Sequence, residues 1–92
     1  MAAKIEVEKV DASHFRVHVI EAGSKSTHQV TLDPKDYARL AGATAEPEEL
    51  IRKSFQFLLE REPKESILSR FDLSVISRYF PEYDREIKKR LL

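Results

Sequence analysis

The three histidines of this sequence, His14, His18 and His28, suggest a metal site. Zinc sites usually need at least three protein ligands, so the three imidazoles would have to converge on one point. His14 and His18 lie four residues apart in an alternating stretch and share one face of the expected strand. The strand pairing favoured by that alternation places His28 opposite Glu21, on the other face. We therefore interpret all three as surface histidines and predict no metal and no other cofactor.

Two further patterns resemble catalytic or phosphate-binding chemistry. Residues 23–27, Gly-Ser-Lys-Ser-Thr, look like the end of a phosphate loop, but the first glycine and the four-residue spacer are missing. A polar hairpin turn is the better interpretation. Acidic pairs such as Glu48 and Glu49 are explained by the helix dipole, and no carboxylate is expected in an apolar cleft that would raise its pKa. No serine has a base and an orienting acid at a recognisable spacing, so we predict that the protein is not an enzyme.

The sequence pattern from 63 to 80 resembles that of a helix-turn-helix, with a tight turn at 71–73 and Arg78 pointing outward from the second helix. Asp72 replaces the usual turn glycine, and the same spacing suits an ordinary helical corner. Residues 62–83 carry three basic and four acidic side chains, a poor footprint for phosphate contacts. A DNA-binding regulator is therefore the alternative function, and nucleic acid is not the partner that we expect.

The preferred function rests on the helix expected over 73–80, which has more apolar circumference than one contact face requires. Arginine and tyrosine are enriched where interfaces are energetically important. We predict a non-catalytic protein-interaction or regulatory module with an unidentified protein partner, and the same helix could also carry self-association. The candidate partner surface consists of Arg70, Arg78, Tyr79 and Tyr83.

The C-terminal half carries a resemblance to known proteins. The run SFQFLLEREPKESIL at 54–68, followed by Phe71-Asp72-Leu73 and by YFPEY at 79–83, looks like a group of small bacterial proteins of unassigned function. The likeness is close in this half and loose in the strand half. It implies a small soluble bacterial protein and assigns no site residue.

The elements that must position these residues begin with three strands, because apolar and polar residues alternate from 4 to 32. A tight turn at 23–26 would set Val17 opposite Leu32, and a three-residue loop before the middle strand would set Val7 opposite Val17. Both registers keep the same residues on one face, which a slip by one residue would not. That apolar face consists of Val7, Phe15, Val17, Val19, Val30 and Leu32.

The pattern becomes helical after the third strand. A short helix over about 34–40 is expected, with Asp33 as its N-cap. Pro47 begins a stronger helix, which ends before Pro63 and carries Phe57 at the margin of its apolar stripe. Shorter helical segments are expected at 63–70, at 73–80 and from 83 to 91.

These elements predict an α+β fold, in which a three-stranded antiparallel meander over about 4–32 packs against a helical half over about 33–91. Three strands alone would be marginal, so the helices must cover their apolar face. A chain of 92 residues is expected to form a single domain, here residues 1–92.

Composition narrows the classes of protein further. The absence of cysteine excludes disulfides, thiolate catalysis and cysteine-ligated metal clusters. Sixteen basic and sixteen acidic side chains balance, so the overall charge favours neither nucleic acid nor an anionic membrane surface. No apolar run exceeds three residues and the start lacks a secretory pattern. We therefore expect no membrane association and a cytoplasmic location.

Overall fold

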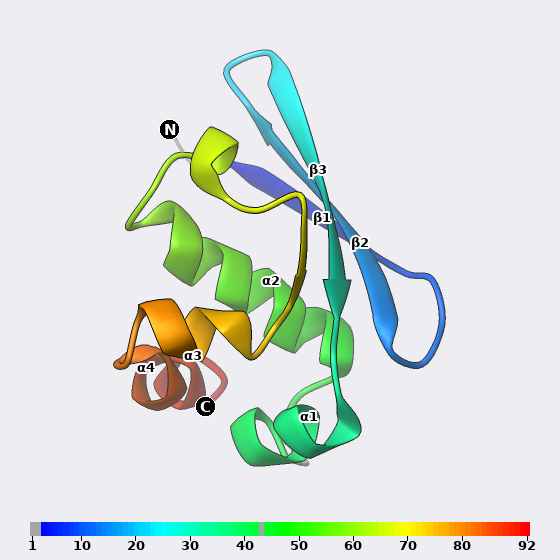
Figure 1. The fold of residues 1–92 in the computed structure, drawn as a ribbon, viewed down its shortest axis with the longest axis vertical. Coiled ribbons are helices and arrows are strands. Elements are labelled where there is room, and N and C mark those ends of the chain that lie inside the picture. The colour runs from blue at the N-terminus through cyan, green and yellow to red at the C-terminus, as the bar shows by residue number, and fades with distance from the viewer. Residues whose placement is uncertain (1–2, 43) are drawn as a thin grey trace.

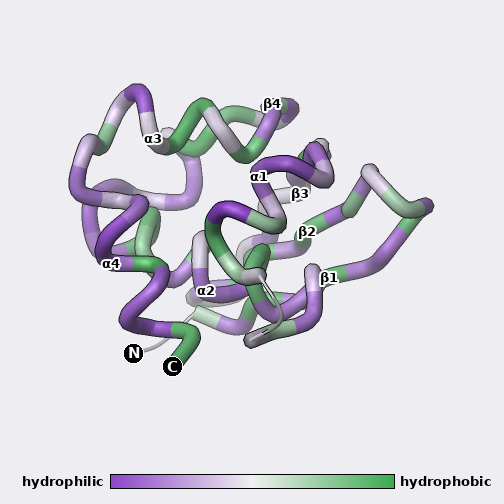
Figure 2. The backbone as a smooth tube through the Cα atoms, turned by 90° about the horizontal axis from the view of Figure 1, so that it is seen from below, coloured by the Kyte–Doolittle hydropathy of each residue, from purple (hydrophilic) through white to green (hydrophobic). Residues whose placement is uncertain are grey.

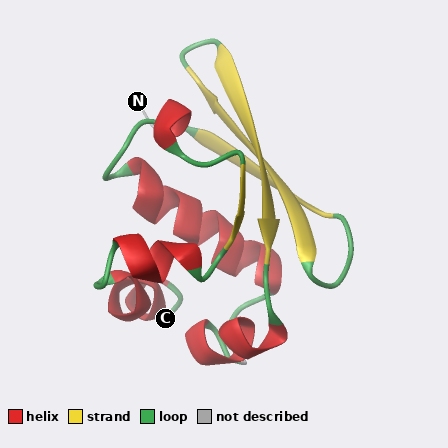
Figure 3. Cartoon of the chain, viewed as in Figure 1, coloured by secondary structure: helices red, strands yellow, loops and turns green. Residues whose placement is uncertain are grey.

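The computed structural model describes residues 3–42 and 44–92. Within these residues the chain forms an α+β fold with four strands and four α-helices, which confirms the predicted class (Figures 1 and 3). No helix in these ranges is long and apolar enough to cross a membrane. In chain order the elements are β1 (Lys4–Lys9), β2 (His14–Glu21), β3 (Ser24–Thr31), α1 (Pro34–Leu40), α2 (Pro47–Leu59), the 3₁₀ helix η1 (Lys64–Ser66), β4 (Arg70–Asp72), α3 (Val75–Tyr79) and α4 (Tyr83–Arg90).

The sheet has the strand order β1-β2-β3-β4 and is mixed. β1, β2 and β3 form the predicted antiparallel meander, and β4 adds to β3 in the parallel direction, with Val30 paired to Phe71. The prediction of a sheet with three antiparallel strands was therefore incomplete. A strand of three residues is too short to show a period of two in the sequence.

The two hairpins differ in how well their registers could be predicted. The first is confirmed, because Val7 pairs with Val17. The second was wrong, because Ala22 and Gly23 form the turn, with φ angles of 53° and 79°. Positive φ at both central residues suits a two-residue hairpin turn. The partner of Val17 thereby moves four positions along β3 to His28, an even shift that keeps the apolar residues on their predicted face.

The helices cover one face of the sheet, which holds the core (Figure 1). Hydrophobic and hydrophilic residues alternate along the strands, as Figure 2 shows. Because alternate side chains point to opposite faces, one face is apolar and the other stays polar. The predicted apolar face is confirmed: Val7 is half-buried, and the fully buried members are Phe15, Val17, Val19, Val30 and Leu32.

α2 is covered on two sides. Its Phe55 packs toward the sheet, with the ring centroid 6.0 Å from that of Phe71. Phe57 packs in another direction, with centroids 5.3 Å from Tyr83 and 5.8 Å from Phe80. The sequence pattern placed Phe57 at the margin of the apolar stripe, yet its side chain is fully buried because α4 supplies a second cover.

Residues 63–80, all of them described, do not form the predicted pair of helices. η1 is one short turn, β4 replaces the expected tight turn, and α3 has only five residues. The main chain of this segment forms hydrogen bonds with β3 instead. Gln29 N–H donates to Ser69 O at 2.8 Å, and Leu73 N–H donates to Thr31 O at 2.9 Å. The helix-turn-helix geometry behind the DNA-binding alternative is therefore absent from this segment.

Candidate functional site

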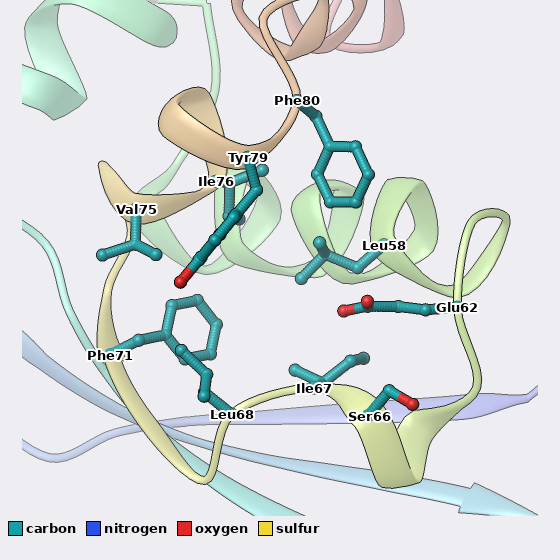
Figure 4. A pocket seen from close by; sticks show the side chains of 10 residues that line it. All are labelled: Leu58, Glu62, Ser66, Ile67, Leu68, Phe71, Val75, Ile76, Tyr79 and Phe80. Atoms are coloured by element: carbon teal, nitrogen blue, oxygen red, sulfur yellow. The ribbon is translucent and has the colours of Figure 1, made fainter.

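A groove opens between the C-terminal end of α2, the η1 segment, β4 and α3 (Figure 4). Its volume is about 440 Å³, within the range of sites that hold small ligands or side chains of a partner. Four consecutive elements of the chain contribute to it, and β4 is held in place by its pairing with β3. Its apolar walls are Leu58, Ile67, Phe71, Ile76, Tyr79 and Phe80.

The rim of the groove exposes large apolar side chains to solvent. Of the four such side chains in the described part of the chain, two border the groove: Leu68 is 50% exposed and Tyr79 is 69% exposed. Single exposed apolar residues are ordinary on protein surfaces, but apolar residues gathered at a concave site indicate a binding surface. The geometry favours the burial of apolar side chains from another molecule.

Glu62 brings a carboxylate into this apolar groove. Figure 4 shows its side chain directed toward Leu58 and Ile67. Glu62 is half-buried, and its carboxylate forms no hydrogen bond or ion pair within residues 3–42 and 44–92. The sequence did not indicate this groove, nor that Glu62 lines it. The polar groups that line the groove, this carboxylate, the Ser66 hydroxyl and the Tyr79 phenol, suit a cation or a hydrogen-bond donor.

The acids next to Glu62 in the sequence are paired, in contrast to it. Glu60 accepts two hydrogen bonds from the guanidinium of Arg90, at 2.6 and 2.8 Å, and these bonds lower the pKa of its carboxyl. The carboxylate of Glu65 accepts a hydrogen bond from the Lys64 ammonium, which lowers its pKa as well. Glu62 is left with its charge facing the groove.

Arg61 does not compensate the charge of Glu62, because it is held elsewhere. Its guanidinium carbon lies 3.5 Å from the centroid of the Phe57 ring, and its Nε donates to Glu82 at 3.4 Å. These contacts place Arg61 over the buried aromatic residues between α2 and α4. The groove therefore keeps an acid without a basic neighbour from its own α2 end.

The predicted partner surface is only partly brought together. Tyr79 lines the groove, while Arg78 is exposed on α3 and Arg70 is exposed on β4. Tyr83 was wrong as a surface residue: it is fully buried where α4 packs on α2, and its hydroxyl lies 2.6 Å from Ser54 Oγ. Burial raises the pKa of the Tyr83 phenol, because the phenolate would lose its hydration.

The three histidines, all predicted to lie at the surface, differ in their positions. His14 and His18 lie on the open face of the sheet, where they pair with Asp11 and Glu8, both at 2.8 Å. His28 was wrong as a surface residue, since the observed register buries it opposite Val17. In the described ranges, no three His, Cys, Asp or Glu side chains gather as a metal site requires.

His28 instead supports the groove from behind. Its Nδ1 donates to the Leu68 carbonyl at 2.7 Å, because a carbonyl oxygen can only accept, and its Nε2 lies 2.8 Å from Ser26 Oγ. The ring also packs on Phe55, with centroids 5.3 Å apart. The histidine thus links β3 to the rim residue Leu68, so the rim is anchored to the sheet through a partly buried hydrogen bond.

The sequence did not indicate the groove, because helices were predicted at 63–70 and 73–80, where the structure has η1, β4 and α3. One signal was present: Glu62 follows the apolar end of a helix and has no basic residue three or four positions away. The resemblance to small bacterial proteins stays a prediction, since no known protein family, no curated protein and no solved structure matches the chain.

Proposed function

We propose that the protein is a non-catalytic protein-binding module whose groove receives side chains of a partner protein. The observation that carries this proposal is the apolar groove with two exposed apolar residues, Leu68 and Tyr79, at its rim. Covering such surface is favourable by roughly 25 cal/mol for each Å² removed from water. A cytoplasmic setting in a bacterium is part of the proposal and rests on the sequence alone.

Catalysis is not proposed for the groove because of its chemistry. Its one carboxylate, from Glu62, shares the groove with the hydroxyls of Ser66 and Tyr79 and with apolar walls. A general base acts on a positioned nucleophile or substrate proton, usually together with a second titrating group. Binding requires only what the groove offers, which is apolar surface and one charge that gives orientation.

A peptide-display selection on the immobilised protein tests the proposal. Random twelve-residue peptides are enriched on the protein, and their affinities are then measured by fluorescence polarisation against two variants. Leu68→Asn changes the rim, and Val10→Asn is the matched control, because Val10 is exposed to a similar degree (54%) but lies outside the groove. We expect Leu68→Asn to weaken binding about tenfold, as the loss of roughly 1.4 kcal/mol of apolar contact would.

The control variant should bind the enriched peptides within about twofold of the original protein, a difference of roughly 0.4 kcal/mol. A selection that enriches no peptide, or peptides that both variants bind equally, would contradict the assignment of binding to the groove. Retained folding of both variants is checked by their circular dichroism and melting temperatures.

A further inference from the structure

The free edge of the sheet lies beside the groove. β4 is the last strand of the sheet in the described ranges, so one of its edges pairs with β3 and the other does not. The edge that pairs is identified by Ser69 O and Leu73 N, which are both bonded to β3. Because the groups that face one neighbour alternate along a strand, the main-chain groups of Arg70 and Asp72 face away from β3.

These outward main-chain groups are open to another strand. No main-chain hydrogen bond from outside the sheet reaches Arg70 or Asp72 in the part of the chain that the structure describes. The same strand provides a wall of the groove through Phe71, and Leu68 precedes it at the rim (Figure 4). A strand added to β4 would lie about 4.8 Å from it and would run along the mouth of the groove.

The periodicity of an added strand matches the shape of the groove. Alternate side chains of an extended peptide point to the same side, about 6.6 Å apart for residues i and i+2. The flanking elements η1 and α3 bound the groove along this direction, and β4 itself has three residues. A short segment therefore fits, with two side chains entering the groove and the one between them facing solvent.

The charge of the groove selects the chemistry of one of these side chains. Glu62 provides an unpaired carboxylate next to Leu58 and Ile67. A lysine or arginine can lay its methylene stem on such apolar walls while its charged group reaches the carboxylate. An apolar side chain then fills the remaining volume near Phe71 and Ile76.

We propose that the groove binds an extended peptide segment of a partner protein, which adds to β4 as a fifth strand and inserts one basic and one apolar side chain two residues apart. This inference rests on the proposed protein-binding function and names its ligand class. Strand addition explains why the apolar groove and the open main-chain edge occur together, since main-chain bonds supply affinity and the groove supplies specificity.

The peptides from the display selection serve as probes for this inference. Each is resynthesised with single N-methyl groups along its main chain, which remove one N–H at a time. Strand addition predicts that methylation at alternate positions weakens binding at least about tenfold and that the positions between them tolerate it. Sequences of the enriched peptides should carry a Lys or Arg two residues from an apolar residue.

Variants of the protein test the same edge and the same charge. Arg70→Pro removes an N–H that faces away from β3, so the existing ladder is kept, and Arg70→Ala controls for the loss of the side chain. We expect the proline variant to bind about tenfold more weakly and the alanine variant within about twofold of the original. Glu62→Gln should weaken binding of the basic peptides about fivefold and reduce its salt dependence, whereas Glu46→Gln, at the other end of α2, should change neither.

The outcomes separate this inference from the proposed function. Groove-dependent peptides that tolerate every N-methyl group, or that space their anchors by three and four residues as a helix does, would overturn strand addition and leave the binding function in place. If the original protein and Glu62→Gln bind the basic peptides with equal affinity, the proposal that a basic side chain enters the groove is overturned. Should Arg70→Pro fail to fold, the methylation series on the unaltered protein still decides the question.

Discussion

The two sides of the C-terminal end of α2 are closed to different degrees. Phe57 and Leu58 are neighbours and both are buried, at 0% and 4% exposure. Over Phe57 the helix α4 supplies Tyr83, and the region is closed. Next to Leu58 the covering elements are η1, β4 and α3, of three, three and five residues, and the groove stays open. Whether an apolar face becomes core or binding surface thus depends on the length of the element available to cover it.

The charges around the two sides differ in the same sense. On the closed side, Arg61 and Arg90 lie over the Phe57 ring and are paired with Glu82 and Glu60. On the groove side, the carboxylate of Glu62 has no partner in residues 3–42 or 44–92. The paired charges already have hydrogen-bond partners within the protein, whereas the unpaired charge at the apolar groove is available to a ligand.

The largest effect is expected from opening the closed side. Phe57→Ala removes a fully buried ring that contacts Tyr83 and Phe80, and it leaves a cavity. The free energy of unfolding should fall by about 3–5 kcal/mol, as is typical of buried phenylalanine. Urea denaturation followed by circular dichroism measures the change. A loss below about 1 kcal/mol would show that α4 doesn't close this side in solution.

A smaller effect is expected from the hydrogen bond inside the closed side. The Ser54 hydroxyl donates to Leu50 O at 2.7 Å, so the Tyr83 hydroxyl is the donor to Ser54 Oγ. Tyr83→Phe removes that bond and keeps the ring, and it should lower the free energy of unfolding by about 0.5–1.5 kcal/mol at neutral pH. An unchanged denaturation midpoint would contradict this role for the phenol.

The same phenol makes the stability of the closed side depend on pH. Burial raises its pKa above the ordinary value of 10.0, so above pH 10 the unfolded chain loses a proton that the folded chain retains. The Tyr83 contribution to the free energy of unfolding therefore falls as pH rises past 10, by at most about 1.4 kcal/mol per pH unit. The difference between the original protein and Tyr83→Phe, measured from pH 8 to 11.5, isolates this contribution from those of lysine and arginine.

The contrast between the two sides also explains which parts of the fold could be predicted. Strong local sequence signals were sufficient to predict the longer elements, namely the alternation in β1 and β2 and the helix that starts at Pro47. The predicted N-cap Asp33 is also confirmed, because its side chain accepts a hydrogen bond from Lys35 N–H. The predicted register of the second hairpin was wrong because Ala22 adopts a positive φ. Alanine rarely does so, and no sequence pattern indicates it.

The groove segment could not be predicted because its structure is decided by partners distant in sequence. Residues 67–73 carry apolar residues at helix-like spacing, yet Phe71 pairs with Val30 and the Leu68 carbonyl accepts from His28, forty residues earlier. These long-range bonds override a weak helical propensity. Of the candidate surface, Tyr79 was placed at the site and Tyr83 was not, since the packing of α4 on α2 decides which tyrosine is covered.

The smallest effect on stability is expected at the groove rim, and it completes the comparison with the closed side. Tyr79 is 69% exposed and its hydroxyl forms no hydrogen bond with another described residue, so Tyr79→Ala should change the free energy of unfolding by less than about 0.5 kcal/mol. Phe80→Ala is the matched control, because Phe80 is the next residue, is half-buried and packs on Phe57. Its loss should cost more than 1 kcal/mol, roughly the cost of uncovering part of a core aromatic pair. Urea denaturation of the two variants side by side gives both values. If Tyr79→Ala destabilised the protein as much as Phe80→Ala, the tyrosine would be holding the fold together, and the rim would be structural surface instead of a surface kept free for a partner.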